Sequence, residues 1–466
     1  MTDPASSTTD VHLALISHTN VGKTSLTRTL LRSDVGEVVD APHTTMENTL
    51  HALATTEGGD RLLLWDTPGF GDSLRLKARL EQRGTAVGWF LSEVWDRVAD
   101  RALHSSQQAM LAARDLTDVI LYQVNAAEDP EFATQVEAEL AMLAWLEKPV
   151  ILLLNQLPPH SRRQEREDLE QRWRDRFAKP PIRRVLALDA FERSWIDEVQ
   201  LLAAVGEVLP RAEQEAMARL LPVWQAKALE RFNASIEAIA ALLVTAILDR
   251  EALSAGQPAR LARMGALRRL ASRLEAAVRK LDETLIRIEG LEGASARRID
   301  TALTATRSHG DRPSPLQGAA GGAALGAGAG AALDLALGGA SLGLFTALGA
   351  SLSAAAGWSW SQRAVDKRTL GWSAPFIEDL LAEAAARYLA VTHHGRGRGR
   401  YEGEALDSWR ELADTAKGKS TADVAALLAA FDDPEPDRLE ERARKAVRSV
   451  LTRALLEEYP HGEWIL

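Results

Sequence analysis

The stretch "ALISHTNVGKTSL", from Ala14 to Leu26, constrains the fold of this chain more than any other. It overlaps the apolar run "VHLALIS", which is rich in strand-forming residues, and "KTSLTRTLLR" then has apolar residues at helical spacing. A strand, a polar loop and a helix in this order are the context of a phosphate-binding loop. The stretch therefore predicts an α/β fold, a P-loop NTPase domain with a mostly parallel sheet.

Three residues of this loop carry the groups that phosphate binding needs. Gly22 lets the backbone curl around the phosphates, Lys23 can neutralise the β and γ oxygens, and the hydroxyl of Thr24 can hold Mg²⁺. Ser17 stands where the usual pattern has its first glycine. A small residue with negative φ can form that bend, so the departure weakens the match without destroying it.

A second motif follows in "RLLLWDTPGFGD", a predicted buried strand that ends at Asp66, with Gly69 in the spacing D-x-x-G. The carboxylate of Asp66 is placed to hold Mg²⁺ through water, and the N–H of Gly69 can reach a γ-phosphate. In "APHTTMENTL", Thr45, with Thr44 as second choice, can complete the magnesium shell only when a γ-phosphate is bound. The segment is therefore predicted to be a switch, the alternative being an ordinary threonine pair at a sheet edge.

These motifs resemble those of Era and TrmE, a branch of the translation-factor class of GTPases. The resemblance rests on "SHTNVGKTSL", "PHTTME" and "DTPGFGD" and extends loosely to about residue 210, through the apolar strands "TDVILYQVNA" and "KPVILLLNQL". It implies a GTPase that hydrolyses GTP to GDP and phosphate with Mg²⁺. It also implies that the whole loop, Val21 and Ser25 included, contacts the guanine nucleotide.

The motif that recognises the guanine base in this family matches the chain less well than the first three motifs do. The family has N-K-x-D, whose aspartate pairs with the guanine edge, whereas this chain has Asn155, Gln156, Leu157 and Pro158. Asn155 and Gln156 are still expected to contact the nucleotide. GTP is favoured over ATP because the other motifs are of the GTPase type, but the selectivity stays open.

Many small GTPases orient the attacking water with a glutamine directly after D-x-x-G, but Phe70 occupies that position here. Hydrolysis therefore needs another group to take this role. In the family, an asparagine at the position of Asn20 helps to bind K⁺, which stabilises the transition state when two G domains dimerise. The predicted catalytic residues are therefore Asn20, Lys23, Thr45 and Gly69, with slow turnover. The alternatives are that Asn20 merely suits a left-handed backbone, and that the protein is a catalytically weak nucleotide-binding scaffold.

The remainder of the chain predicts an all-α C-terminal half. A short heptad-like seam of Leu270, Leu274, Val278, Leu281 and Leu285 favours packing inside a helical bundle over a stalk or dimer contact. The predicted divisions are a flexible lead (1–10), a G domain (11–210), a helical domain (211–315), a Gly/Ala-rich apolar hairpin (316–360) and a C-terminal helical region (361–466). The long connection after Gly71 is either an output lever or a stabilising insertion.

A glycine-zipper segment at 318–360 has Asp334 as its one ionisable residue. Small residues at four-residue spacing let helices approach closely in lipid, which favours association with a membrane or a membrane-protein partner. The weak hydrophobicity of glycine and alanine leaves packing within the protein as the alternative. The layout resembles a bacterial family of Era-like GTPases with such a C-terminal domain, and a cytoplasmic location associated with the inner membrane is expected.

The composition of the chain excludes several kinds of partner and site. The net charge of −10 argues against a surface that binds nucleic acid throughout, and the chain has no cysteine for disulfides or thiolate zinc sites. Its ten histidines show no ligand spacing. The predicted partners are a guanine nucleotide, a membrane or membrane protein, and a second G domain.

Overall fold

The computed structural model describes residues 8–18, 21–32, 49–71, 73, 77, 101–157, 163–190, 192–253, 259–293, 296–300, 303, 369–395, 404–430 and 436–466. They form two compact units. The first comprises Met1–Leu229, His393–Gly399 and Gly462–Ile465, and the second comprises most of the remainder of the chain. Asn20, Thr44, Thr45, most of the connection after Gly71 and the whole segment 318–360 lie outside the described residues.

The first unit is built on a six-stranded sheet with the order β2-β3-β1-β4-β5-β6. Its strands are β1 (Asp10–Ser17), β2 (Thr49–Thr55), β3 (Arg61–Asp66), β4 (Val119–Asn125), β5 (Val150–Asn155) and β6 (Ile182–Ala187). The edge strand β2 pairs with β3 in antiparallel orientation, and all other neighbours are parallel. The predicted mostly parallel α/β fold is confirmed.

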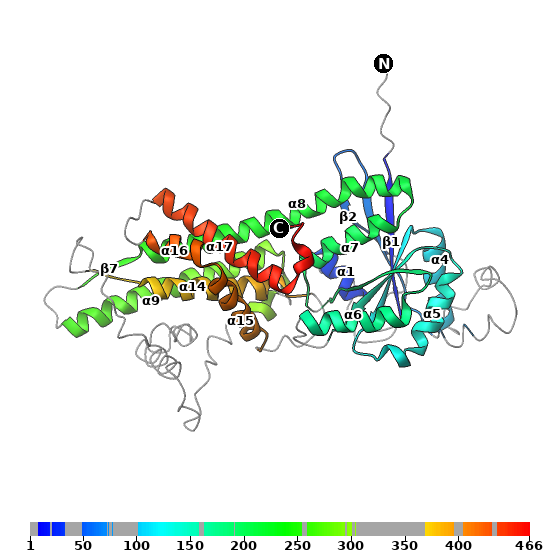
Figure 1. Cartoon of the computed structure of the whole chain (residues 1–466), viewed down its shortest axis with the longest axis horizontal. Coiled ribbons are helices and arrows are strands. Elements are labelled where there is room, and N and C mark those ends of the chain that lie inside the picture. The colour runs from blue at the N-terminus through cyan, green and yellow to red at the C-terminus, as the bar shows by residue number, and fades with distance from the viewer. Residues whose placement is uncertain are drawn as a thin grey trace, which may run out of the picture. The chain divides into compact units, whose positions relative to one another are not determined.

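The helices of this unit lie between the strands along the chain, except α7, which follows the last strand. They are α1 (Lys23–Leu31), α4 (Arg101–Asp115), the 3-10 turn η1 (Pro130–Phe132), α5 (Thr134–Ala144), α6 (Arg163–Phe177) and α7 (Trp195–Val208). Figure 1 shows α1 and α7 on one side of the sheet and α4 and α5 on the other. Because both faces are covered, β4 and β5 are continuous apolar runs rather than alternating ones.

The strand register places the site residues at one edge of the sheet. Ser17 at the end of β1 is level with Gln123 of β4, and Asn125 is level with Asn155 at the end of β5. Asp66 ends β3 beside Leu15 of β1. Since β1 has β3 on one side and β4 on the other, the loop after β1 opens at a topological switch point, where α/β proteins bind ligands.

The second unit is helical, as the sequence predicts. Helix α8 (Arg211–Leu248) contains the boundary between the units, after Leu229. The other elements are β7 (Arg250–Ala252), α9 (Ala259–Ile288), β8 (Thr369–Gly371), α14 (Ala374–Thr392), α15 (Glu404–Lys419), α16 (Thr421–Ala429), α17 (Pro436–Glu458) and η3 (Pro460–Gly462). The five apolar side chains of the α9 seam are each at most 3% exposed, so the seam packs inside this unit.

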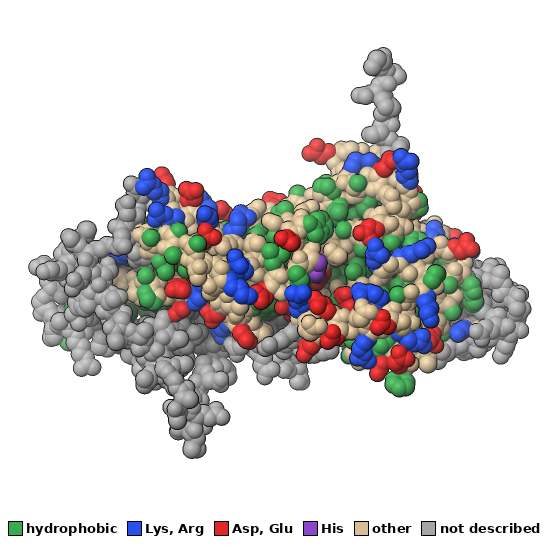
Figure 2. All heavy atoms as spheres, in the orientation of Figure 1, with side chains coloured by type: hydrophobic (Ala, Val, Ile, Leu, Met, Phe, Trp, Pro, Cys, Tyr) green, Lys and Arg blue, Asp and Glu red, His purple; other side chains and the backbone are tan. Residues whose placement is uncertain are grey.

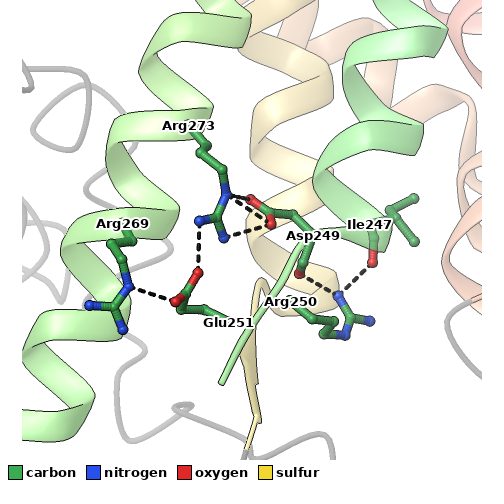
Figure 3. A network of polar contacts seen from close by, with 6 residues as sticks. All are labelled: Ile247, Asp249, Arg250, Glu251, Arg269 and Arg273. Atoms are coloured by element: carbon green, nitrogen blue, oxygen red, sulfur yellow. Dashed lines mark hydrogen bonds and ion pairs between the residues drawn. The ribbon is translucent and has the colours of Figure 1, made fainter. Parts of the chain in front are cut away.

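Two ionic networks hold α9 in place. Arg387 of α14 is fully buried and binds Asp282 of α9 at 2.8 Å and Glu383 at 2.9 Å. Burial alone would lower the pKa of Arg387, but these carboxylates raise it above its usual value. In the other network, Arg273 of α9 binds Asp249, which immediately precedes β7, and Glu251, which lies within β7 (Figure 3).

Helix α8 is, among the described helices, long and apolar enough to cross a membrane by length and composition, and half of its most apolar window is buried in the protein. Figure 2 shows positive and negative side chains interleaved over the described part of one face of the molecule.

Within the first unit, Arg219 of α8 forms a two-pronged contact with the buried carboxylate of Asp60, at 2.7 and 3.0 Å. The hydrogen bond from Arg219 lowers the pKa of Asp60 to about 2, although burial opposes the shift. An ion pair of this kind stabilises the fold fully above the pKa of the unfolded carboxyl, and its contribution is lost as the pH falls through the folded pKa.

We therefore expect Arg219→Ala to lower the free energy of unfolding by about 1 kcal/mol at neutral pH, since half of Arg219 is exposed and screened. The difference from wild type should shrink as the pH falls from about 4 to 2. Chemical denaturation across this pH range measures it. Arg211→Ala in the same helix is the control, because Arg211 is 92% exposed and should matter little at any pH.

Candidate nucleotide-binding site

The phosphate loop enters helix α1 through a glycine with a left-handed backbone. Gly22, the N-cap residue, has φ 98° and ψ 27°. A Cβ atom added to Gly22 would lie 2.9 Å from Nδ2 of Asn155, so both the backbone angle and the space require glycine. Ser17, by contrast, ends β1 with extended backbone and needs no such freedom, which explains why serine is tolerated there.

Lys23 begins α1 and is 8% exposed. Its Nζ donates to Oγ of Ser17 at 3.1 Å, and this hydroxyl in turn donates to the carbonyl of His18 at 2.5 Å. Burial lowers the pKa of Lys23, and the negative charges of Asp66 and Glu139 oppose that shift. The serine that replaces the first glycine thus holds the lysine at the site.

Asp66 is the second charged residue of the site and is 5% exposed. Burial raises its pKa to about 6, and the charge of Lys23 opposes the rise. Its Oδ1 has no hydrogen-bond partner among the described residues. The hydroxyl of the buried Thr27 lies close enough to the carboxylate to oppose the rise of its pKa as well. A buried carboxylate oxygen without a partner, with a hydroxyl at Thr24 on α1, is the oxygen-rich set that Mg²⁺ prefers.

The segment after Asp66 is bound to the phosphate loop. Oγ1 of Thr67 donates to the carbonyl of Leu15 at 2.8 Å, and the amide of Phe70 donates to the carbonyl of Ser17 at 2.9 Å. These bonds hold Gly69, which is buried, beside the loop. The Phe70 ring is fully buried in the core of the sheet, so it neither faces a nucleotide nor can orient water.

Three side-chain amides converge on one carbonyl of the loop. The Val21 carbonyl accepts from Asn155 at 2.6 Å, from Gln123 at 3.3 Å and from Gln156 at 3.4 Å. Oδ1 of Asn155 accepts from the amide of Ala190 at 2.8 Å. Asn155 is fully buried and therefore joins the phosphate loop to the loops after β5 and β6.

Sequence reasoning missed a polar cluster beneath the loop. Glu139 of α5 is fully buried and is bound by Nδ1 of His18 at 2.7 Å and the hydroxyl of Tyr122 at 2.8 Å. Burial, with the charge of Glu139, raises the pKa of Tyr122 well above its usual value. Glu139 sits in an ordinary helical pattern, so only the fold could reveal that it faces His18 and Lys23.

The predicted site residues therefore divide into two groups. The structure brings Val21, Gly22, Lys23, Thr24 and Ser25 together at the start of α1, with Asp66, Gly69, Asn155 and Gln156 at the neighbouring strand ends. Asn20, Thr44 and Thr45 lie outside the described residues, and their roles stay predictions. Among the described residues there is no group of three or more acidic or histidine side chains that could hold a metal by themselves.

Comparison with known families supports a GTPase domain. Residues 12–156 match the family model described as 50S ribosome-binding GTPase, which implies binding of guanine nucleotide and Mg²⁺. Residues 307–455 match a model described as a domain of unknown function (DUF3482). No curated protein matches the chain.

Among solved structures, the chain is similar to Era in complex with MgGDPNP and nucleotides of 16S ribosomal RNA, and to a variant of Aquifex aeolicus Era bound to GDP.AlF4⁻. Each is 19% identical with a TM-score of 0.33, and the match covers 44% of this chain and 58% of that chain. A structure of the chloroplast translocon components atToc33 and psToc159 is 15% identical with a TM-score of 0.25, covering 39% of this chain and 70% of that one. Its authors describe dimerisation as important for the GTPase activity of those components.

The bonds of Asn155 predict a structural effect without nucleotide. We expect Asn155→Ala to lower the free energy of unfolding of the nucleotide-free protein by about 2–4 kcal/mol, because the carbonyl of Val21 loses its shortest hydrogen bond and the amide of Ala190 its acceptor. Chemical denaturation measures this loss.

Asn125→Ala is the matched control, since Asn125 lies level with Asn155 at the end of β4 and caps only an exposed turn. The control should change stability by well under 1 kcal/mol. Equal, small effects of both variants would mean that Asn155 does not hold the loops together.

Proposed function

We propose that the first unit is an Era-like GTPase that binds GTP with Mg²⁺ and hydrolyses it to GDP and phosphate. One observation carries the proposal: a left-handed glycine at the start of α1 stands beside a buried lysine and a buried aspartate with an unpartnered oxygen. Without a ligand, such burial of two opposite charges is costly, and a nucleotide phosphate with Mg²⁺ would satisfy both. The match of residues 12–156 to a GTPase family supports the same reading.

Each residue then has a defined role. Lys23 stabilises charge on the β and γ oxygens, Thr24 and Asp66 hold Mg²⁺, and the amide of Gly69 binds the γ-phosphate. Thr45 is proposed to complete the magnesium shell in the GTP state. Asn20 is proposed to bind K⁺ at the contact between two G domains.

The burial of Phe70 favours slow hydrolysis, because this side chain offers no group to position the attacking water. The same observation keeps the second candidate function, a nucleotide-binding scaffold with little or no turnover. The two functions differ in whether phosphate is released at all.

Phosphate release from GTP, and separately from ATP, in K⁺ and in Na⁺ distinguishes them. We expect slow GTP turnover that K⁺ stimulates and that Lys23→Ala reduces by about 10²–10³-fold, since the lysine stabilises transition-state charge. Lys179→Ala, an exposed lysine of the same unit, is the control and should leave the rate unchanged.

Each other outcome is informative. Equal rates in Na⁺ and K⁺ would remove the K⁺ role of Asn20 but leave the GTPase. Nucleotide binding without turnover under every condition would contradict hydrolysis and favour the scaffold.

We further propose that the nucleotide state is passed to the helical half. Two stretches of the main chain support this. Helix α8 continues from the first unit into the second, and the segment after α14 returns to the first unit, where the carbonyl of His393 accepts from the amide of Arg193 at 2.9 Å. Arg193 binds Glu198 at 2.5 Å, and Glu198 also binds Arg32 at the end of α1. Two ion pairs and one backbone hydrogen bond thus lead from the end of the phosphate-binding helix to His393.

The helical half is proposed to associate with a membrane or a membrane-protein partner. The protein is then cytoplasmic and is attached to the inner membrane through this half. The support is the glycine-zipper spacing of 318–360, with Asp334 as its one ionisable residue. The feeble hydrophobicity of this segment fits association that depends on the nucleotide state.

Flotation of the full chain with anionic phospholipid vesicles, in the presence of GDP or a non-hydrolysable GTP analogue, checks this proposal. We expect the protein to float with vesicles in one nucleotide state. Leu344→Arg within the segment should abolish flotation, because an arginine costs about 2.5–3.5 kcal/mol at the centre of a membrane helix.

Leu261→Arg is the matched control, since Leu261 is 58% exposed on α9 and should tolerate the charge. Absence of the protein from the vesicle fraction in every nucleotide state would contradict membrane association.

A further inference from the structure

The loop after β6 brings an aspartate to the loop after β5. Asp189 lies two residues beyond the end of β6 and is 6% exposed. Its Oδ2 accepts from the amide of Leu157 at 2.9 Å. Leu157 immediately follows Gln156, and Asp189 therefore lies at the same sheet edge as the phosphate loop.

The position of this carboxylate is fixed by the residues on both sides of it. The amide of Leu188 donates to the carbonyl of Leu154 at 3.0 Å, and the amide of Ala190 donates to Oδ1 of Asn155 at 2.8 Å. Three consecutive residues, 188–190, thus bond to the end of β5 and the loop that follows it. Because Asn155 also binds the Val21 carbonyl, the carboxylate is tied to the phosphate loop through one side chain.

The chemistry of the purine edge explains what a carboxylate can do here. Guanine presents two adjacent donors, N1–H and the 2-amino group, and a carboxylate can accept from both. Adenine has an acceptor at N1 and so offers no such pair. Pro158, where an aspartate would be expected, has no side-chain acceptor, and Asp189 is the one acidic residue of 155–158 and 188–190.

We propose that Asp189 is the specificity-determining residue that recognises the guanine base, in place of the missing aspartate at 158. This inference rests on the proposed function, because it requires that the site binds a nucleotide. It names the ligand as a guanine nucleotide and assigns the contact to the loop after β6. The buried Asn155 positions the two loops between which the base is held.

Titration with diphosphates that differ only in the base tests the inference on the full chain with Mg²⁺. The probes are GDP, inosine diphosphate, xanthosine diphosphate and ADP. The wild type should bind GDP about tenfold more tightly than inosine diphosphate, which lacks the 2-amino donor, and about 100-fold more tightly than ADP.

The variant Asp189→Asn distinguishes recognition of the guanine base from a purely structural role of Asp189 in holding the loop after β5. The amide oxygen of asparagine can still accept from the amide of Leu157, so the loop is retained. The amide N–H₂ group can donate to the 2-oxo group of xanthine but opposes the donors of guanine. The variant should therefore lose about 10- to 100-fold in affinity for GDP and gain affinity for xanthosine diphosphate.

Asp175→Asn is the matched control, an exposed aspartate on α6 of the same unit, and should leave all four affinities unchanged. Equal weakening of all four ligands by Asp189→Asn, or no change, would show that Asp189 only braces the loop and would overturn the inference. If the wild type binds GDP and ADP equally, guanine recognition fails while nucleotide binding stands. If it binds none of the four, the proposed function fails as well.

Discussion

The fully buried amide of Asn155 is the contact on which the candidate site depends. It donates to the carbonyl of Val21 and accepts from the amide of Ala190, so it connects the phosphate loop with the loops after β5 and β6. This side chain is costly to lose, because the amide of Ala190 would be buried without its acceptor and the carbonyl of Val21 would keep only the longer hydrogen bonds from Gln123 and Gln156. The same side chain would also lie only 2.9 Å from a Cβ atom at Gly22, so glycine at 22 and asparagine at 155 depend on each other.

Around this connection the site concentrates charge in a place with little water. Lys23, Asp66 and Glu139 are each at most 8% exposed, and the charges of both carboxylates act on Lys23. Such an arrangement is unfavourable in an ordinary core, because the desolvation penalty of buried charges can exceed the attraction between them. It is favourable in a site that receives a polyanion with a divalent cation. The burial of Lys23 and Asp66 and the unpartnered Oδ1 of Asp66 therefore support a nucleotide site independently of the sequence motif.

The second unit uses buried charge differently. Arg387 is fully buried and ion-paired with Asp282 and Glu383, although its Nε has no hydrogen-bond partner among the described residues. Arg273 is paired with Asp249, immediately before β7, and with Glu251 of β7. The pair of Arg387 with Asp282 joins α14 to α9, which are far apart in the sequence, and the pairs of Arg273 join α9 to β7 and the residue before it. The first unit, meanwhile, includes segments from the end of α14 and from the C-terminal end of the chain. The GTPase-like unit is therefore not a contiguous piece of sequence, and its main chain continues into the helical half within α8 and again on both sides of the segment that returns after α14.

Local sequence patterns were enough to predict the strand–loop–helix at Ala14–Leu26, the strand that ends at Asp66, β4, β5 and the helical nature of the second half. These features depend on local periodicity and on residues whose chemistry is specific, such as a glycine followed by lysine and threonine. The sequence did not reveal β2 or β6 as strands, nor the roles of Glu139, Gln123 and Asp189. β2 is an exposed edge strand and β6 is short with two exposed arginines, so neither has a clear apolar pattern. Glu139 and Asp189 are ordinary acidic residues until parallel pairing brings strand ends from distant parts of the chain to one edge, and only the tertiary structure decides that neighbourhood.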